Sequence, residues 1–265
     1  MSSQRDYYEF MGYSSDELRA RYAPYADRFA GGGTVVDIGC GRGEFLELLA
    51  GRGVAGVGID LDAEMVEEVR RKGLDARQAA AVDFLGGHER SFDGVFAAHL
   101  IEHLPADAVV DLIAVAARSL KEGGRLLVVT PNPHSLGMQL YEFWTDLQHV
   151  RFYTPEIVRW VFHRAGLSEL ETGENELYLT GRPRFDEMPP SVAPAPAGGK
   201  RRLRDRARSR FGRLAVPSLV QRIQELEERA DRLARGQQQL LDSVLGLFPP
   251  SEYFVTGVAR VGAPD

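Results

Sequence analysis

The feature that most limits how this chain can fold is a glycine-rich turn, Gly39-Cys-Gly-Arg-Gly43, which follows the β-branched run at 34–37. Glycine lacks a Cβ and tolerates left-handed backbone angles, so glycines at alternate positions permit a tight turn and the close approach of a ligand. A helical pattern follows at 45–50. A strand, a glycine turn and a helix in this order predict an α/β domain whose helix N-terminus faces a polar ligand.

The same alternation of short apolar runs and helical patterns continues along the chain. It predicts strands at 34–37, 56–60, 74–79, 92–99 and 125–130, with helices at 45–50, 63–72 and 106–120. Strands that alternate with helices favour a parallel sheet covered on both faces. A further helix is expected at 155–165, because Pro155 opens it and Gly166 ends it, and a strand is expected at 167–180.

The pattern changes after Gly181. Residues 183–199 are rich in Pro, Ala and Gly, which is typical of a linker. Residues 200–213 contain eight Lys or Arg and one Asp, within a chain of net charge −6. We expect this basic stretch to contact an anionic surface such as the inner face of a membrane, or to form a solvated arm.

A heptad pattern occupies 217–248. Its seam alternates spacings of four and three and consists of Leu219, Ile223, Leu226, Ala230, Leu233, Gln237, Leu240, Val244 and Leu247. Such a seam favours a coiled coil and hence a homodimer, although a helix folded back on its own domain has the same pattern. The chain closes with a strand pattern at 251–260.

Acidic side chains stand at the ends of three successive predicted strands: Asp37, Asp60 and Asp83. The carboxyl ends of parallel strands meet at one edge of a sheet, where open α/β folds bind their ligands. A carboxylate only accepts hydrogen bonds, so Asp60 is suited to two adjacent ligand hydroxyls. A single ligand site at this edge is therefore expected.

The spacing G-x-G-x-G, with Asp37 two residues before the first glycine, resembles motif I of the class I S-adenosylmethionine-dependent methyltransferases. The resemblance implies a Rossmann-like seven-stranded sheet and S-adenosylmethionine as cofactor. In that family Asp60 would bind the ribose and Asp83 with Phe84 the adenine. The cofactor-binding residues that it implies are Asp37, Gly39, Cys40, Gly41, Gly43, Asp60, Leu61, Asp83, Phe84 and His99.

The resemblance also implies how the chain is divided. The last two strands of that fold are antiparallel, so the helical, coiled-coil segment would be an insertion before the last strand. The expected parts are an N-terminal helical lid at 1–33, a core at 34–180, a linker at 181–216, the heptad helix at 217–248 and the final strand at 249–265.

The segment from His99 to His103 resembles ubiquinone-biosynthesis O-methyltransferases, which bind a divalent cation through Glu-x-x-Glu-His. Here His99 replaces the first Glu of that pattern. Metal binding is therefore not favoured, although Glu102 and His103 remain weak candidate ligands.

The segment 146–156 resembles bacterial methyltransferases associated with glycan assembly. We expect His149 to be the general base, since histidine is the usual one at neutral pH, and Asp146 to orient it. The favoured function is methyl transfer to a hydroxyl of a sugar or glycan intermediate. The alternatives are a small phenol or quinone as acceptor, or a non-catalytic coiled-coil scaffold that retains the fold.

Net charge, cysteine content and hydropathy limit the partners and the location that the sequence allows. The negative net charge and the absence of an Asp/Asn-Pro-Pro-Tyr signature disfavour a nucleic-acid partner. One cysteine, Cys40, allows no internal disulfide, and no apolar run reaches the roughly 20 residues of a membrane span. The sequence thus favours a cytoplasmic protein, peripheral at most to the inner membrane face.

Overall fold

The computed structural model describes residues 14–176, 178, 216–246 and 249–260. The chain divides into two compact units, 1–181 with 249–265 and 182–248, and each is treated by itself. Residues 1–13, most of the expected linker and the basic stretch 200–213 lie outside the described residues. None of the helices in the described ranges is long and apolar enough to cross a membrane.

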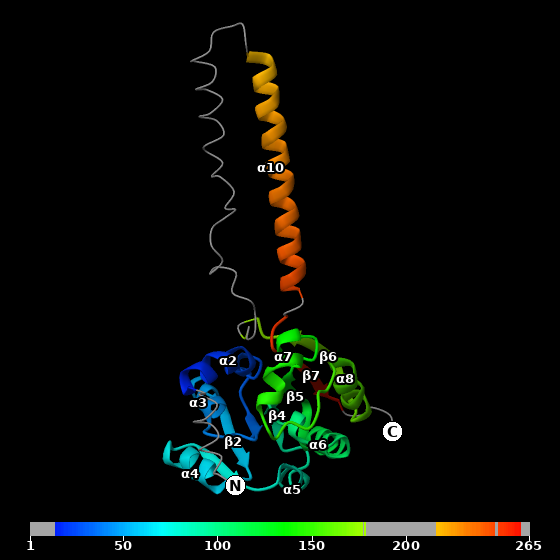
Figure 1. Ribbon diagram of the computed structural model, residues 1–265. Coiled ribbons are helices and arrows are strands. Elements are labelled where there is room, and N and C mark those ends of the chain that lie inside the picture. Colours follow the sequence, from blue (N-terminus) through cyan, green and yellow to red (C-terminus); the bar gives the residue numbers. More distant parts are fainter. Residues whose placement is uncertain (1–13, 177, 179–215, 247–248, 261–265) are drawn as a thin grey trace. The chain divides into compact units, whose positions relative to one another are not determined.

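The larger unit is built on one seven-stranded sheet with the order β3-β2-β1-β4-β5-β7-β6 (Figure 1). Neighbouring strands are parallel except around β7, which runs antiparallel to both β5 and β6. This is the Rossmann-like sheet that the sequence predicts. The strands are β1 (Thr34–Ile38), β2 (Ala55–Asp60), β3 (Asp75–Gln78), β4 (Phe92–Ala98), β5 (Leu120–Pro131), β6 (Leu167–Glu174) and β7 (Glu252–Ala259).

Helices cover both faces of this sheet. One layer holds α2 (Ser15–Asp27), α3 (Glu44–Gly51) and α4 (Ala63–Arg71), and the other holds α5 (Ala81–Gly86), α6 (Ala106–Ser119) and α8 (Pro155–Arg164). Their starts follow local chemistry, since the side chains of Ser14, Asp62 and Thr154 cap α2, α4 and α8.

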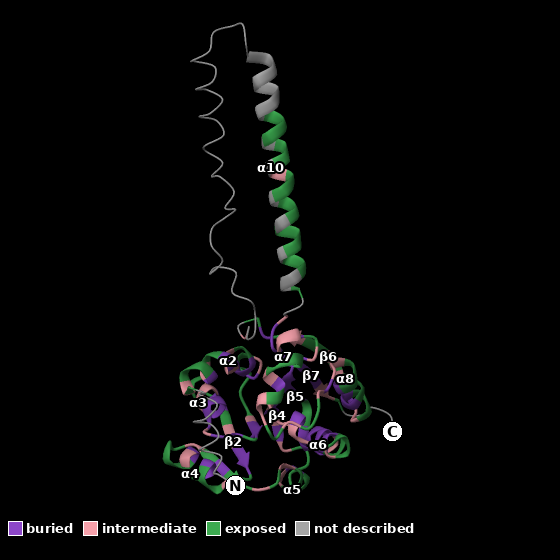
Figure 2. Ribbon diagram, viewed as in Figure 1, coloured by how far each residue is buried: buried purple, intermediate pink, exposed green. Residues whose placement is uncertain are grey.

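Alternation along the strands separates two apolar cores. Val35 and Phe96 face the layer of α2 to α4, whereas their neighbours Val36 and Val95 face the layer of α5, α6 and α8. Successive side chains of a strand point to opposite faces, so an uninterrupted apolar run serves both cores. Figure 2 shows the buried residues gathered on the strands and on the helix faces that meet them.

Two expected boundaries are wrong. The expected strand at 167–180 ends earlier, at Glu174, which forms the last pair of β6 with β7, opposite Tyr253. The expected strand at 125–130 begins earlier, since β5 starts at Leu120, and its register with β4 shifts between Phe92 and Gly94.

Helix α10 (Val216–Leu245) belongs to the smaller unit and lies between β6 and β7 in the sequence. Three leucines of its expected seam, each seven residues from the next, are exposed: Leu226 by 59%, Leu233 by 65% and Leu240 by 66%. Large apolar side chains in such a row are costly to leave in water.

Candidate active site

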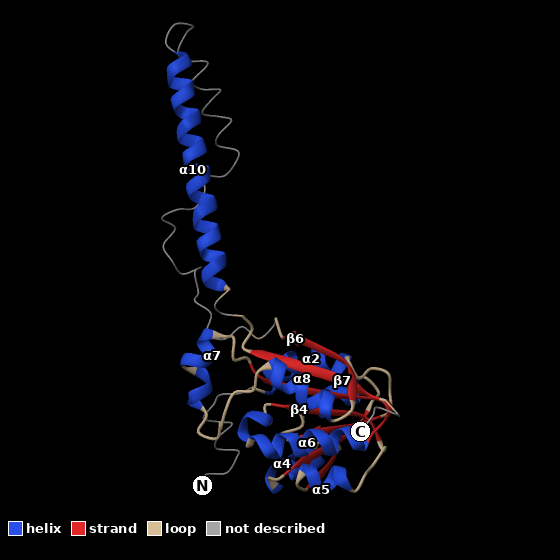
Figure 3. Ribbon diagram, turned by 90° about the vertical axis from the view of Figure 1, so that its right-hand side faces the viewer, coloured by secondary structure: helices blue, strands red, loops and turns tan. Residues whose placement is uncertain are grey.

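A cavity of about 700 Å³ lies where β1, β2 and β4 end. The glycine turn and the ends of these strands line one part of it. Short helices that follow β5, namely α7 (Leu136–Leu140) and η2 (Glu142–Thr145), contribute to the other part. Figure 3 shows α7 at one end of the strands. The sheet therefore supplies one wall of the site and the loops after the strands supply the rest.

The glycine turn closes tightly over the end of β2. Gly39 and Gly43 have φ angles of +70° and +84°, and a Cβ on Gly43 would lie 2.9 Å from the side chain of Val69. The amide of Gly39 donates to the carbonyl of Ile59 at 2.8 Å. Gly39 and Cys40 line the cavity, where the buried thiol of Cys40 packs against Gly58. Gly41 and Gly43 shape the turn without lining the cavity.

Asp37 lies at the bottom of this part of the cavity with its side chain almost fully buried. Its Oδ2 atom has no hydrogen-bond partner among the described residues. Burial raises the pKa of this carboxyl, and the nearby charges of Asp60 and Glu44 raise it further. A buried, unpartnered acid is stabilised by a cation beside it. The site therefore fits a ligand that carries positive charge, as the ammonium and sulfonium groups of S-adenosylmethionine do.

Asp60 is buried at the end of β2 and lines the cavity beside the exposed Leu61. Its two carboxylate oxygens accept from the amides of Gly41 and Asp62, each at 2.9 Å. Burial raises the pKa of Asp60, while these amide bonds lower it. Each oxygen keeps acceptor capacity for a ligand hydroxyl, as the sequence-based prediction requires.

The expected adenine-binding pair is not at the cavity, which corrects the prediction from the sequence. Asp83 is exposed on α5, and Phe84 stacks on His88 with ring centroids 4.4 Å apart. The reason is that α5 begins at Ala81, so Asp83 falls inside the first turn of the helix instead of in the loop after β3. The cavity wall there consists of residues 79–82.

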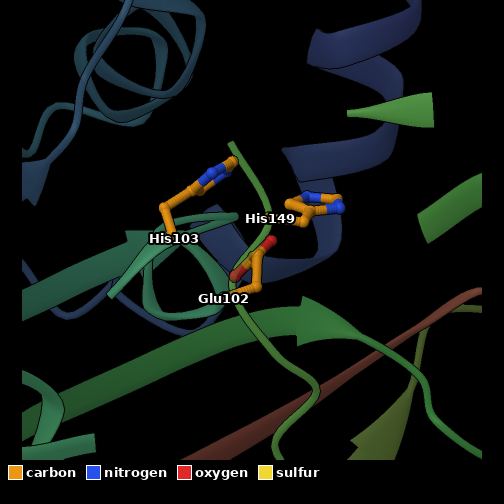
Figure 4. Close-up of side chains that lie close together, drawn as sticks. All are labelled: Glu102, His103 and His149. Atoms are coloured by element: carbon orange, nitrogen blue, oxygen red, sulfur yellow. The ribbon is translucent and has the colours of Figure 1, made fainter. Parts of the chain in front are cut away.

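His149 lines the opposite part of the cavity, and Figure 4 shows its side chain near those of Glu102 and His103. Its Nδ1 lies 2.6 Å from the carbonyl oxygen of Phe143, and its ring stacks on the Phe143 ring. A carbonyl only accepts, so Nδ1 carries the proton and Nε2 keeps its lone pair. Burial lowers the pKa of His149. The neutral form, which can accept a proton, is therefore favoured near pH 7.

The side chain of Asp146 does not hydrogen-bond to the ring of His149, contrary to the expected orienting role; only the backbone carbonyl of Asp146 accepts from the amide of His149, at 3.3 Å. Its Oδ2 lies 3.6 Å from His149 Nε2 and 4.0 Å from His103 Nε2. Its Oδ1 instead accepts from the amide of Gln148 at 2.8 Å. The ring of His149 is held by Phe143, and Asp146 places a carboxylate between the two histidines.

Glu102, His103 and His149 form a cluster whose ligand atoms lie within 4.8 Å of one another (Figure 4). Glu102 is fully buried. Its Oε2 accepts from the Thr130 hydroxyl, and its Oε1 lies at hydrogen-bond distance from His99 Nδ1. His103 Nδ1 is buried without a hydrogen-bond partner among the described residues. Glu102 and His103, the weak metal candidates from the sequence, are thus brought together with His149.

His99 lines the cavity in a left-handed conformation, with φ of +51°. Its Nδ1 lies 3.1 Å from Glu102 and its Nε2 lies 2.9 Å from Glu252. Burial and the charge of Arg21 lower the pKa of His99, but the bonds to the two carboxylates outweigh them, so its pKa lies above the usual value.

Several residues of the site were not found by sequence reasoning. Arg21, Glu44 and Tyr178 line the cavity. Glu252 does not line it but hydrogen-bonds to two side chains that do, those of Arg21 and His99. Glu44 follows the glycine turn directly, so its place at the cavity could have been predicted from the motif. The others carry no local signal, because their partners are distant in sequence.

The sheet order, the antiparallel β7, the glycine turn and the acids at the strand ends together define a class I S-adenosylmethionine-dependent methyltransferase. A family model described as a methyltransferase domain matches residues 7–172. The chain therefore belongs to this methyltransferase family, and S-adenosylmethionine is its cofactor.

Named relatives agree with this membership. The chain is 30% identical over 187 residues to the ubiquinone biosynthesis O-methyltransferase of Xylella fastidiosa strain M23, which covers 62% of this chain and 75% of that protein. It is 35% identical over 121 residues to the enzyme of the same name from Thiobacillus denitrificans, covering 43% and 51%.

Solved structures share the fold. A SAM-dependent methyltransferase from Archaeoglobus fulgidus superposes with a TM-score of 0.68 at 23% identity, covering 97% of this chain and all of that one. Phosphoethanolamine N-methyltransferase 2 from Haemonchus contortus, solved with S-adenosyl-L-methionine, gives 0.55 at 19% identity, with 98% and 60% covered.

Proposed function

We propose that this protein transfers a methyl group from S-adenosylmethionine to a hydroxyl oxygen, with His149 as the general base. The observation that carries the proposal is the state of the His149 ring. The Nδ1–H group donates a hydrogen bond to the carbonyl of Phe143, so Nε2 keeps its lone pair. The side chain lines the cavity, where this lone pair can accept a proton. Two relatives named O-methyltransferases support an oxygen acceptor.

The main contribution of the protein to this reaction is to position the acceptor hydroxyl and the methyl donor. When bound, S-adenosylmethionine supplies an activated methyl group on a sulfonium. The glycine turn with Asp37 and Asp60 would hold the cofactor, and the cavity would position the acceptor oxygen to receive the methyl group. His149 Nε2 would accept the hydroxyl proton as the methyl group leaves the sulfonium. An alcohol needs such a base because its own pKa lies far above 7.

For the acceptor we propose a polyhydroxylated compound, such as a sugar or a glycan intermediate. Support comes from hydrogen-bonding side chains near His149 that line the cavity: Glu142, Thr145, Asp146 and Gln148. A small phenol is the second candidate, because of the names of the relatives. Labelled-methyl transfer to a panel of mono- and oligosaccharides and a matched panel of catechols separates the two. Labelling of catechols alone would overturn the sugar proposal.

A divalent cation at Glu102, His103 and His149 is a second candidate for activating the hydroxyl. The ligands of one ion at about 2.1 Å lie no more than about 4.2 Å apart, and this cluster spreads to 4.8 Å. The oxygens of Glu102 are also engaged by Thr130 and His99.

We therefore expect protein treated with EDTA and then desalted to keep its methyl-transfer activity within about twofold, since none of the proposed steps uses a metal. The measurement is the initial rate with and without added Mg²⁺ or Zn²⁺. A loss of activity that Mg²⁺ restores would favour the metal-assisted reaction and would recast His149 as a ligand.

We propose further that α10 pairs with a second copy of this chain. The exposed leucines at Leu226, Leu233 and Leu240 recur every seven residues, and burial of such a row is what a coiled coil provides. Leu233→Asp is expected to convert a dimer into a monomer at micromolar concentration, as measured by light scattering. Arg235→Asp, an exposed position two residues away on another face of α10, is the control and should stay dimeric. A monomeric wild-type protein would end this proposal.

A further inference from the structure

A single buried carboxylate, Glu252, gathers side chains from several distant parts of the larger unit. It is the first residue of β7 and is fully buried. Its Oε2 accepts from Arg21 Nε at 2.6 Å, and its Oε1 accepts from the Tyr25 hydroxyl at 2.7 Å and from Asn175 Nδ2 at 2.6 Å. His99 Nε2 lies 2.9 Å away. This amount of bonding to one acid exceeds what packing β7 into the sheet requires.

The charge on Glu252 is stabilised by these partners. Burial raises the pKa of the carboxyl, but the charge of Arg21 and the bond from His99 outweigh burial, so the pKa lies well below its usual range. Arg21 is itself 9% exposed and lies against the ring of Tyr178, with its guanidinium carbon 3.6 Å from the ring centroid. A buried ion pair of this kind is stable only while both partners remain.

Two of the partners are walls of the cofactor cavity. Arg21 comes from α2, together with Leu18 and Tyr22 of the same helix, and His99 comes from the end of β4. Neither partner is adjacent to Glu252 in sequence, since Arg21 is 231 residues away and His99 is 153 residues away. The positions of α2 and of His99 at the cavity thus depend on the same carboxylate.

The chain of contacts continues to the other side of the cavity. His99 Nδ1 lies 3.1 Å from Glu102, and the backbone carbonyl of Glu102 accepts from the amide of Val150 at 2.8 Å. Val150 follows His149 directly. Contacts therefore run without a break from α2 through Glu252, His99 and Glu102 to the segment that carries His149.

We propose that Glu252 is a positioning residue for this methyltransferase, which holds Arg21 of α2 and His99 in place as walls of the cofactor cavity. The carboxylate of Glu252 contacts neither the glycine turn nor the cavity. It acts through Arg21 and His99, whose side chains line the cavity. The expected consequence of its loss is a looser cofactor site in a protein that still folds.

The test compares cofactor affinity with thermal stability in the full chain. Glu252→Gln preserves the shape of the side chain but leaves Arg21 as an unpaired buried charge, so we expect both a lower Tm and a Kd for S-adenosylhomocysteine raised about tenfold. The double variant Arg21→Gln/Glu252→Gln removes the unpaired charge. We expect its Tm to recover towards the wild-type value while its Kd stays about tenfold raised, because the bonds from the Glu252 carboxylate that position Arg21 and His99 at the cavity are lost.

A matched control comes from the end of the same helix. Arg28, the C-cap residue of α2, pairs with Glu171 of β6 at 2.8 Å, and neither residue lines the cavity. Arg28→Gln/Glu171→Gln should leave the Kd unchanged. The proposal is overturned if Kd recovers together with Tm in the Arg21/Glu252 double variant, which would make the role structural only, or if Glu252→Gln binds S-adenosylhomocysteine as the wild-type protein does. Neither measurement uses a methyl acceptor, so the outcome is independent of the role proposed for His149.

Discussion

His149→Ala is expected to lower kcat by about 10²–10⁴-fold, the range that a positioned general base contributes. The affinity for S-adenosylhomocysteine should stay within about twofold of wild type, because the base removes the proton of the acceptor and the donor site lies at the glycine turn. Initial rates of labelled-methyl transfer and calorimetric titration measure the two quantities. A variant that keeps full activity would remove His149 from the mechanism.

The chain offers a matched control in His88. Its Nδ1 also bonds to a backbone carbonyl, that of Phe84 at 2.7 Å, but its side chain is exposed and does not line the cavity. His88→Ala should keep the wild-type kcat. A loss of activity in both variants would trace the effect to lost histidine packing and not to proton transfer.

The pH profile provides a second measurement of His149. Burial lowers its pKa, so the free base persists to more acidic pH than an ordinary histidine with a pKa of about 6.5 allows. Activity should be flat near neutral pH and should fall only as the pH drops through this lowered pKa, where the ring becomes protonated. An acidic limb above about pH 6.5 would contradict the assignment.

Asp60→Asn is expected to raise the Kd for S-adenosylhomocysteine by about tenfold to a hundredfold. A hydrogen bond to a charged group contributes about 1.5–3 kcal/mol, and each 1.4 kcal/mol is a factor of about ten. The amide also has only one oxygen to serve the Gly41 and Asp62 amides together with the ligand hydroxyls. Calorimetric titration measures the change directly.

Asp62→Asn is the control for that variant. Asp62 caps α4 by accepting from the amide of Glu64 at 2.7 Å and does not line the cavity. Asparagine caps helices about as well as aspartate, so this variant should bind as the wild-type protein does. Equal weakening by both substitutions would mean that the end of β2 is merely destabilised and that Asp60 does not bind the ribose.

The gathering of Asp37, Gly39 and Asp60 at one cavity could be predicted from the sequence because its parts are local. Each of the three stands at or just after the end of a predicted strand, and parallel strands bring their carboxyl ends to one edge. The same argument failed for Asp83, since α5, a helix that the sequence pattern did not predict, begins at Ala81 and carries Asp83 onto its exposed face. Element boundaries are what local patterns specify least well.

The amino-acid sequence by itself determined the sheet, the glycine turn and the position of the inserted helix, because apolar periodicity, glycines and caps act over a few residues. Only the tertiary structure decided that Phe143 and not Asp146 orients His149, and that Glu252 joins Arg21 to His99. Those contacts depend on strand order and on the fit of side chains from distant segments. A buried carboxylate is stable only with such partners around it, and no spacing along the chain specifies which residues they are.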